Sequence, residues 1–544
     1  MSRSRGLVWL AVIALATGGI VPSVRAQIVS RAIESEAERQ RLGIERQTRP
    51  QRQSGPGVVA PAPGPRLEFP AGGTKILLTR IDFAPSHFLT SADLDAIRAR
   101  SVGREVDLAA IGAIVQSVND LYAERGLITA SAVLPPQKLD GGVLTIGLVE
   151  GRLGTVGLSG AVQTWPWYIR AQIPAREGEV VDAPALNRSV SLFNRLNDLQ
   201  VRAQLGPGAS FGLTNLDFAI TEPARNIVQL SFDNQGVIST GRYQGTLFWR
   251  HHNLLGIDDR LIVYGSRVRG SVLGSASYTL PVSPWGTRLG ASFNRSAYRI
   301  VAGQIRELRP EGVSESASLT LSQPIFATDL VLLQATGSYG LGSGRSKQLD
   351  IATVDSRYRR LMAGAALTVS LPSLQHSSAA NWASVTHENL IFGDKRDFVL
   401  LTGNTTTVWR ITDDIYGSLV GAWQHSRERQ LPGDQIFQIG GPTTVRGYPV
   451  GAAFGHSGFY AQAELHYVLP EPLRQLEAFV FLDHGITYAS VVAPARATAV
   501  GAGLIWRPLD WATLEGGFGH ALERVSASQR DVELYVRLSL RKSL

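Results

Sequence analysis

The amino-acid sequence predicts α+β domains, two in number, followed by a transmembrane antiparallel β-barrel of about sixteen strands. Three observations lead to this fold class. Beyond residue 26 the chain has no run of roughly 18 apolar residues, the length that a spanning helix needs, so a membrane-embedded chain must cross as a closed barrel. Residues 74–224 combine helix and strand patterns. From residue 225 onwards, apolar and polar residues alternate with a period of two.

The first 26 residues are typical of a secretory signal peptide. Arg3 and Arg5 precede the apolar stretch 7–21, and Val24-Arg25-Ala26 forms a small-residue cleavage site before Gln27. The chain contains no cysteine, which excludes disulfides and thiolate metal sites. This composition suits an exported protein in an oxidising compartment.

Residues 27–48 are rich in Glu, Arg, Ala and Gln, a composition that favours a helix. The proline-rich segment 49–73 follows and predicts an extended linker. A helix on such a tether could enter the barrel or stay exposed beside it, and the residues alone leave both alternatives open.

Segments 74–151 and 152–224 each predict a small domain with the order β-α-α-β-β. In the first domain we expect a strand at 76–83, a helix capped by Ser91, a helix at 107–124 and strands at 129–134 and 143–149. In the second we expect helices near 165–172 and 184–198 and strands near 199–205 and 214–221.

Segment 225–544 carries the barrel pattern. In 459–469 the odd positions are apolar, and Gln462, Glu464 and His466 face the other way. Lipid on one face and a wet lumen on the other require this alternation, and at roughly 20 residues per strand with its loop the segment holds about sixteen strands. A soluble β-sandwich would hardly need so long an unbroken segment.

Counting connections back from the C-terminus places 431–457 in an extracellular loop long enough to fold into the barrel. This loop contains Val445-Arg446-Gly447-Tyr448, and a cation inside a barrel requires an acidic partner. Phe481-Leu482-Asp483-His484-Gly485 offers one on strand 475–486. Asp483 shares its face with Phe481, and because a carboxylate is disfavoured in lipid, this face is expected to line the lumen.

Together with Leu134–Gln137, Gly141–Leu144 and Val149–Arg152, these motifs resemble those of the two-partner secretion transporters (TpsB type). These form the ShlB/FhaC/HecB haemolysin secretion/activation family of the BamA-like superfamily. The resemblance implies POTRA domains at 74–151 and 152–224, a plug helix at 27–48 and a sixteen-stranded barrel at 225–544.

The resemblance also assigns roles to the two motifs. Val445, Arg446, Gly447 and Tyr448 form the loop motif, and Phe481, Asp483 and Gly485 form the barrel-wall motif. Arg446 should form a salt bridge with Asp483 inside the barrel. The pair either gates the pore or only holds the loop in place.

The function that the resemblance implies is an outer-membrane pore that exports, with or without activation, a large β-helical TpsA-type client such as a haemolysin or adhesin. The POTRA domains would lie in the periplasm and bind the unfolded client by strand addition, with 129–134 and 214–221 as the receptive strands. No nucleotide or other cofactor is implied. Outer-membrane lipid and, during biogenesis, the barrel-assembly machinery are the other expected partners, although the chain ends in Arg541–Leu544 and not in the terminal aromatic residue usual for barrel insertion.

Three other classes of function compete with this interpretation. A barrel-assembly or autotransporter-assembly factor would share both motifs but usually has three or more POTRA domains. An enzyme needs a nucleophile and a base, and Thr386-His387-Glu388-Asn389 lacks the second His of a zinc helix, so no catalytic or metal-binding residue is predicted. The net charge of +8 is not gathered on one basic face with aromatics, so no nucleic-acid partner is expected.

Overall fold

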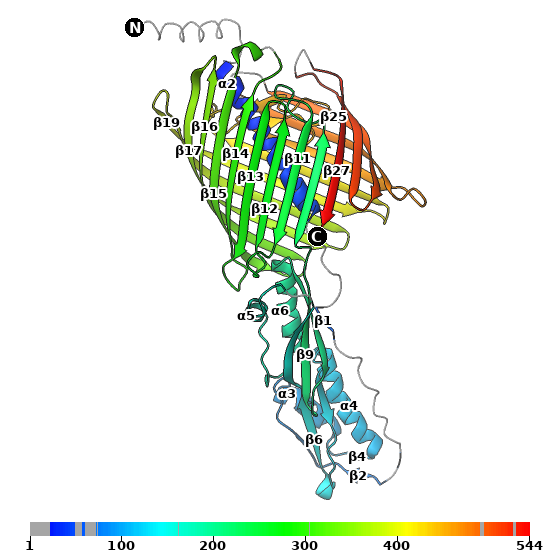
Figure 1. The fold of residues 1–544 in the computed structure, drawn as a ribbon. Helices are drawn as coiled ribbons and strands as arrows, with labels where there is room; N and C mark the ends of the chain where they lie inside the picture. Colours follow the sequence, from blue (N-terminus) through cyan, green and yellow to red (C-terminus); the bar gives the residue numbers. More distant parts are fainter. Residues whose placement is uncertain are drawn as a thin grey trace. The chain divides into compact units, whose positions relative to one another are not determined.

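The computed structural model describes residues 22–48, 57–59, 72, 74–160, 163–303, 305–489, 494–525 and 529–544. The chain divides into two compact units (Figure 1). Residues 51–223 form one unit, and the N-terminal 50 residues together with 224–544 form the other. The predicted signal peptide 1–26 lies outside the described residues except for 22–26, and the predicted linker 49–73 lies outside them except for 57–59 and 72.

A closed antiparallel barrel forms the larger unit, and the described residues contribute sixteen strands to it. It begins with β10 (Asn226–Asp233), and β27 (Val532–Ser543) closes it by pairing with β10 from Ile227↔Ser543 to Asp233↔Arg537. The strands between them are β11 (Gln244–His252), β12 (Arg260–Val268), β13 (Ser271–Pro281), β14 (Arg288–Arg299), β15 (Glu311–Ala327), β16 (Val331–Gln348), β17 (Ile351–Leu371), β18 (Leu374–Asn389), β19 (Asp394–Arg410), β20 (Ile415–Ser426), β23 (Ser457–Val468), β24 (Leu476–Tyr488), β25 (Ala495–Leu509) and β26 (Ala512–Ala521). The predicted fold class is confirmed.

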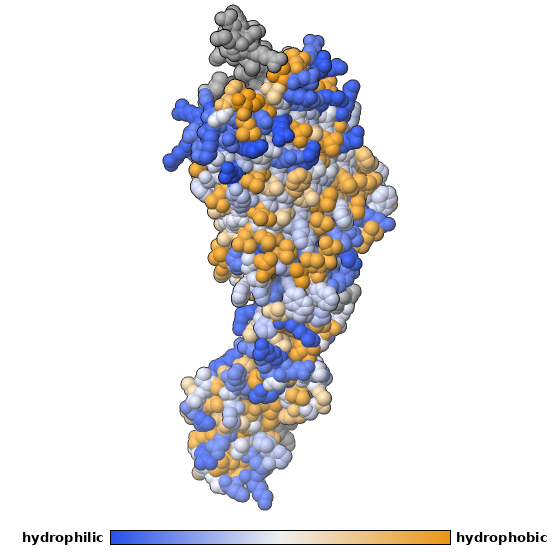
Figure 2. Space-filling model, turned by 60° about the vertical axis from the view of Figure 1, so that its left-hand side comes forward, coloured by the Kyte–Doolittle hydropathy of each residue, from blue (hydrophilic) through white to orange (hydrophobic). Residues whose placement is uncertain are grey.

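The two faces of the barrel wall differ as the alternation predicts. In β24, Val480 and Leu482 point outwards and are 55% and 52% exposed, whereas Phe479, Phe481 and Asp483 are buried inside. Figure 2 shows apolar side chains gathered over the barrel, with hydrophilic ones at its upper rim. An apolar outer surface and a polar interior are what a barrel in lipid requires.

Among the described helices, none combines the length and the apolar character that crossing a membrane would need.

The connection between β20 and β23 folds into a two-stranded hairpin made of β21 (Phe437–Ile439) and β22 (Ala453–Gly455). It spans residues 427–456, close to the predicted loop 431–457. The turn between the two short strands carries the Val-Arg-Gly-Tyr motif. Thr444, Val445 and Tyr448 in this turn are almost completely buried, so the turn is packed against other parts of the barrel unit and is not a solvent-exposed loop tip.

Helix α2 (Pro22–Gln47) runs through the interior of the barrel, as the blue segment in Figure 1 shows. It begins before the predicted range 27–48 and ends one residue earlier. Ile33, Ala37 and Ile44 pack against aromatic and aliphatic side chains of the wall. That cluster comprises Phe248, Ile262, Tyr264, Leu273, Tyr298 and Ile300. An apolar stripe along one face of α2 therefore has its counterpart inside the barrel.

The first small domain contains β3 (Arg80–Phe83), α3 (Ser91–Ser101), α4 (Leu108–Glu124), β5 (Ala130–Val133) and β6 (Val143–Glu150), the predicted β-α-α-β-β order. Two details differ from prediction. Thr90, not Ser91, caps α3, because Thr90 and Asp93 form a reciprocal capping box. The predicted strand 76–83 is split: β2 (Ile76–Leu77) pairs with β4 (Glu105–Val106), whereas β3 pairs with β6, and η1 (Asp140–Gly142) precedes β6.

The second small domain contains β7 (Arg152–Ser159), α5 (Pro166–Gln172), α6 (Ala183–Leu196), β8 (Gln200–Pro207) and β9 (Leu213–Thr221). Its sheet has the order β1-β8-β9-β7, in which β1 (Val58–Val59) comes from the linker. The prediction that strand 214–221 is a receptive edge is therefore wrong. This strand lies within β9, which is paired on both sides.

Strand β5, the other predicted receptive strand, does lie at the edge of its sheet, whose order is β3-β6-β5. However, the backbone N–H of Ala132 donates a hydrogen bond of 2.7 Å to Asn119 Oδ1 on α4. One backbone donor of β5 is thus already satisfied within the domain, a common protection of edge strands.

Glu150, at the end of β6, joins three parts of the first domain. It accepts hydrogen bonds from Ser86 Oγ at 2.5 Å, the His87 N–H at 2.7 Å and the Tyr122 hydroxyl at 3.1 Å. Burial raises the pKa of the Glu150 carboxyl, but these hydrogen bonds outweigh it by stabilising the charged form. The pKa therefore lies below its ordinary value of 4.5. The stabilisation is fully present above that value and is lost as the pH falls through the lower folded-state pKa.

We predict that Glu150→Gln destabilises the first small domain by about 1 kcal/mol at neutral pH, because charge-assisted hydrogen bonds become neutral ones. The difference from wild type should vanish well below pH 4.5, where Glu150 itself is protonated. Urea unfolding followed by circular dichroism, at neutral and at acidic pH, measures the difference in the free energy of unfolding between the variant and wild type. Glu124→Gln, at an exposed position on α4, is the control that should match wild type. An undiminished difference at acidic pH would contradict the charge-based account.

Candidate functional site

The candidate site is the inward turn of the β20–β23 loop and the barrel wall that it contacts. Gly440, Gly441, Gly447 and Gly451 all have positive φ, which favours glycine and lets the chain reverse direction within a few residues. The Gly441 N–H donates a 3.1 Å hydrogen bond to the Val445 carbonyl, which tightens the turn immediately before Arg446. The arginine is thereby presented from a compact, glycine-rich backbone.

Arg446 and Asp483 form a bidentate ion pair. Arg446 Nε lies 2.7 Å from Asp483 Oδ2, and Arg446 Nη2 lies 2.7 Å from Asp483 Oδ1. The backbone N–H of Arg446 donates a further 2.9 Å hydrogen bond to Asp483 Oδ2. Asp483 is 0% exposed and Arg446 is 6% exposed, so both charges are removed from water.

Two other groups complete the surroundings of the guanidinium. Arg446 Nη1 donates to Glu464 on β23, and Arg446 Cζ lies 3.6 Å from the centroid of the Phe481 ring, a cation–π contact. Phe481 of the wall motif thus faces the arginine. Sequence reasoning missed Glu464 as a partner, although its position on the lumen-facing row with Gln462 and His466 was the available signal.

Glu464 connects Arg446 to a wider polar network on the wall. His466 Nε2 lies 3.0 Å from Glu464 Oε2, and His466 Nδ1 lies 2.6 Å from Glu477 Oε1. Glu477 also accepts a 2.7 Å hydrogen bond from Arg507 Nη1. The ion pair is therefore one end of a chain in which acidic and basic side chains alternate across β23, β24 and β25.

The glycine of each motif provides space for the other element. A Cβ on Gly485 would lie 3.1 Å from Val445 Cγ2, so the wall glycine leaves room for the loop valine. A Cβ on Gly519 of β26 would lie 2.6 Å from the Gly447 backbone nitrogen. Gly447 and Gly519 hence pack backbone against backbone. A side chain at Gly519 would overlap the turn, whereas Gly447 is favoured by its positive φ and by the 3.1 Å that would separate a Cβ from the Gly519 backbone.

Tyr448 fixes the far side of the turn. Its hydroxyl donates towards the carbonyls of Thr498 at 3.0 Å and Glu523 at 2.9 Å, and it accepts from the Thr498 N–H at 3.1 Å. The ring is buried with Val445 and Ile439 in one apolar cluster. The structure thus brings together all seven residues named from the two motifs: the loop residues contact β24, β25 or β26, and the wall residues contact the loop.

Helix α2 contacts the same turn. Thr443, three residues before Arg446, donates a 2.5 Å hydrogen bond to Glu36 Oε2 and accepts one of 2.8 Å from Arg39 Nε. The Ile28 carbonyl accepts a 2.8 Å bond from Gln438 Nε2 on β21. The helix is thereby attached to the loop as well as to the wall.

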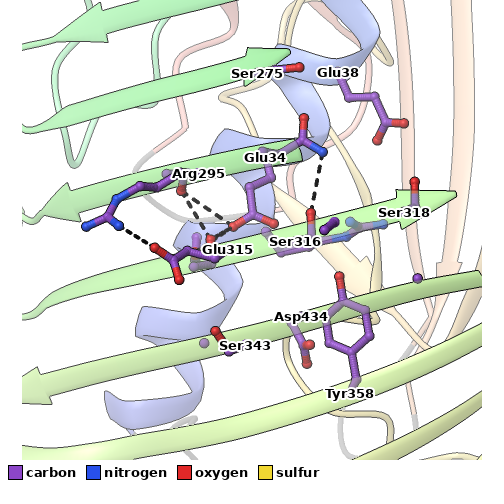
Figure 3. A pocket seen from close by; sticks show the side chains of 18 of the residues that line it. Glu34, Glu38, Ser275, Arg295, Glu315, Ser316, Ser318, Ser343, Tyr358 and Asp434 are labelled. Atoms are coloured by element: carbon purple, nitrogen blue, oxygen red, sulfur yellow. Dashed lines mark hydrogen bonds and ion pairs between the residues drawn. The ribbon is translucent and has the colours of Figure 1, made fainter. Parts of the chain in front are cut away.

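Polar cavities remain on the sides of α2. One of about 330 Å³ lies between the helix and strands β13 to β17, and another of about 1060 Å³ lies on its opposite side towards β19, β20 and β23. Figure 3 shows the first, with Glu34 and Glu38 of α2 near a wall row that includes Ser316, Ser318 and Ser343. The helix occupies the lumen without filling it.

The segment 386–389, whose His-Glu pair resembles part of a zinc-binding helix, lies in β18. His387 is a buried wall residue whose Nε2 is 3.4 Å from Asp434 Oδ1 of the loop. A strand places its side chains on alternate faces, unlike the helix on which the zinc motif depends.

Comparison with known proteins agrees with this architecture. The model of the haemolysin secretion/activation protein family ShlB/FhaC/HecB matches residues 212–339 and 342–505, and that of the ShlB-type POTRA domain matches 76–151. The outer membrane transporter CdiB of Dickeya dadantii is 26% identical over 417 residues, covering 73% of both chains. The heme/hemopexin transporter protein HuxB of Haemophilus influenzae is 23% identical over 435 residues, covering 76% of both.

Solved structures share the fold. CdiB from Escherichia coli superposes with a TM-score of 0.66 at 21% identity and covers 96% of this chain and 99% of its own. BamA from Haemophilus ducreyi, lacking its POTRA domains 1–3, gives a TM-score of 0.54 at 13% identity, covering 86% of this chain and 100% of its own.

The barrel, the small domains before it and the inward loop together define an outer-membrane protein transporter of the POTRA-plus-barrel class. More narrowly, the chain belongs to the ShlB/FhaC/HecB haemolysin secretion/activation family. It is a two-partner secretion transporter of the outer membrane that translocates a partner protein, with its POTRA domains in the periplasm.

We predict that Gly519→Ala displaces the turn from the wall, because the added methyl group would overlap the Gly447 backbone. Faster proteolysis of the loop in the detergent-purified protein would report the displacement. Gly516→Ala on the same strand is the matched control, since a Cβ there meets nothing nearer than the Tyr535 carbonyl oxygen at 4.0 Å. Equal protection in both variants would contradict the packing argument.

Proposed function

We propose that α2 and the inward turn together close the secretion pore at rest, and that both must move for the client to pass. The observation that carries this proposal is the position of Thr443. It contacts Glu36 and Arg39 of α2 and lies three residues before Arg446, which is paired with the wall. Helix and turn are thus joined to each other and form one obstruction.

The Arg446–Asp483 pair acts in this proposal as a conformational latch. A buried ion pair contributes little net stability compared with an apolar replacement, but separating its partners leaves a charge unpaired at a cost of about 3–5 kcal/mol. Such a pair therefore strongly favours one position of the turn. Glu464, whose side chain is 23% exposed, offers Arg446 a second carboxylate nearer to the open lumen.

The client is a large secreted TpsA-type protein that crosses unfolded. Extended client segments add as strands to the POTRA domains, since main-chain hydrogen bonds can hold an unfolded chain largely independently of its sequence. The small hydroxyl side chains of the wall beside α2 offer a polar, weakly binding surface for passage. Folding of the client outside biases movement outwards without nucleotide.

Further parts of this proposal concern chemistry and other partners. We expect no catalytic role, since transport needs none. Lipid contacts the apolar outer face of the barrel, the barrel-assembly machinery inserts it, and nucleic acid is not a partner. The cavities on either side of α2 favour a small residual conductance at rest.

Asp483→Asn should release the latch, because Arg446 would then remain buried without its ionised main partner. We expect the inner position of the turn to lose about 3–5 kcal/mol. The turn should then leave the lumen more often, so single-channel conductance at rest should rise severalfold and a co-expressed TpsA-type client should be secreted faster than by wild type. Arg446→Lys should behave similarly, since an ammonium cannot form the bidentate pair.

Glu464→Gln is the matched control for these variants, because the side chain is partly exposed and the Asp483 contact persists. It should change conductance and secretion much less. Unchanged secretion and unchanged single-channel conductance in both Asp483→Asn and Arg446→Lys would refute the latch.

Removal of residues 27–48 should raise single-channel conductance severalfold, because the cavities flanking α2 would merge into one channel. The milder double variant Glu36→Ala/Arg39→Ala should increase the frequency of open events by cutting the contacts with Thr443. Glu38→Ala, on the face of α2 towards the first cavity, is the control and should leave gating as in wild type. A wild-type conductance after deletion would show that α2 does not obstruct the pore.

A further inference from the structure

The strands of the two small domains differ in what occupies their edges. β9 is central in its sheet, and the edge strand β5 has its Ala132 N–H bonded to Asn119. The start of β7 is covered by the loop before α6, through an isolated bridge between Arg152 and Val180. In the described part of the second POTRA domain, the linker strand β1 adds to the sheet as an extended segment. It pairs with the outer edge of β8.

The pairing of β1 with β8 is parallel and in defined register, with Val58 opposite Ala203 and Val59 opposite Gln204. The Ala203 N–H donates a 2.8 Å hydrogen bond to the Gly57 carbonyl. These contacts are the main-chain contacts by which any extended peptide augments a sheet.

The linker also touches the helix that covers this sheet. A Cβ on Gly57 would lie 3.0 Å from Val190 Cγ1 and 3.1 Å from Asn187 Oδ1, both on α6. Gly57–Val59 therefore sits in the groove between β8 and α6, a helix–strand groove of the kind that accepts extended peptides. The described part of the linker pairs with two residues of β8, whereas β8 itself extends from Gln200 to Pro207.

We propose that Gly57–Val59 occupies the β8–α6 groove as an intramolecular competitor, which an extended segment of the secreted client must displace in order to add to β8. The inference rests on the proposed function, because it supposes an unfolded client that binds by strand addition. The ligand class is a short extended peptide with small or β-branched residues, like the linker itself. A client segment that displaces β1 also frees the tether that leads back to α2.

Because the chain contains no cysteine, a pair of introduced cysteines can test the position of the linker directly. Val59 and Gln204 are opposite one another and both exposed, and neighbouring strands lie about 4.8 Å apart, within the Cα separation of a disulfide. Val59→Cys/Gln204→Cys should therefore form an intramolecular disulfide and hold β1 in the groove. Val59→Pro should release it, because proline cannot donate to the ladder. Val58→Ile is the control that keeps a strand-forming residue.

The probe is a fluorescent peptide with the sequence of residues 55–64, added to the full-length transporter in detergent and followed by fluorescence anisotropy. A tethered competitor has an effective concentration on the order of millimolar, so the peptide should bind Val59→Pro at least about tenfold more tightly than wild type. Val58→Ile should match wild type. The oxidised double-cysteine protein should bind no peptide and recover wild-type binding on reduction.

Equal peptide affinity in wild type, Val59→Pro and the oxidised double-cysteine protein would overturn the inference, as would failure of the disulfide to form under oxidising conditions. Neither outcome touches the latch, which is judged by secretion and conductance of the Asp483→Asn variant. Conversely, the peptide could bind as expected while Asp483→Asn and Arg446→Lys show wild-type secretion and conductance. That result would support the groove proposal and refute the latch alone.

Discussion

The ion pair between Arg446 and Asp483 is the interaction on which the interior of the barrel depends. A carboxylate on the inner face of a membrane strand is costly unless a cation meets it, and Asp483 is completely buried. Arg446 satisfies it with two side-chain contacts and one backbone contact. The turn that carries Arg446 must therefore enter the barrel, and its backbone is then brought against β26 at Gly447 and Gly519. One electrostatic requirement thus positions an entire loop.

The position of the loop in turn determines what the helix can do. Because Thr443 is held near Arg446, it presents a hydroxyl to Glu36 and Arg39, and α2 gains a polar attachment in addition to its apolar contacts with the wall. Polar attachments of this kind are exchangeable, since a client or water can replace each hydrogen bond. A helix that is held by a few such contacts can stay inside the barrel at rest and still be displaced from it. In the second small domain, two linker residues, Val58 and Val59, cover the edge of β8.

Much of this site follows from local patterns in the chain. Alternation along 475–486 places Asp483 on the lumen face, and counting connections places Arg446 in an inward loop. Glu464 was missed because a lumen-facing row contains several polar residues, and nothing local distinguishes the one that meets a distant loop. Gly519 was missed for the same reason: its role is to be close to Gly447, a contact between segments far apart in the chain. Strand 214–221 was misjudged because its alternation does not reveal how many neighbours it has.

The sequence by itself determined the barrel class, the lipid-facing and lumen-facing rows and the order of elements in the small domains, because these follow from local periodicity and local turn chemistry. Only the tertiary structure decided which strands lie at sheet edges and that the linker pairs with β8. It also decided that α2 and the barrel wall both bind the turn that carries Arg446. These features depend on pairing between residues distant in sequence. Backbone hydrogen bonds are nearly the same for every residue type, so no pattern along the chain records which partner they will find.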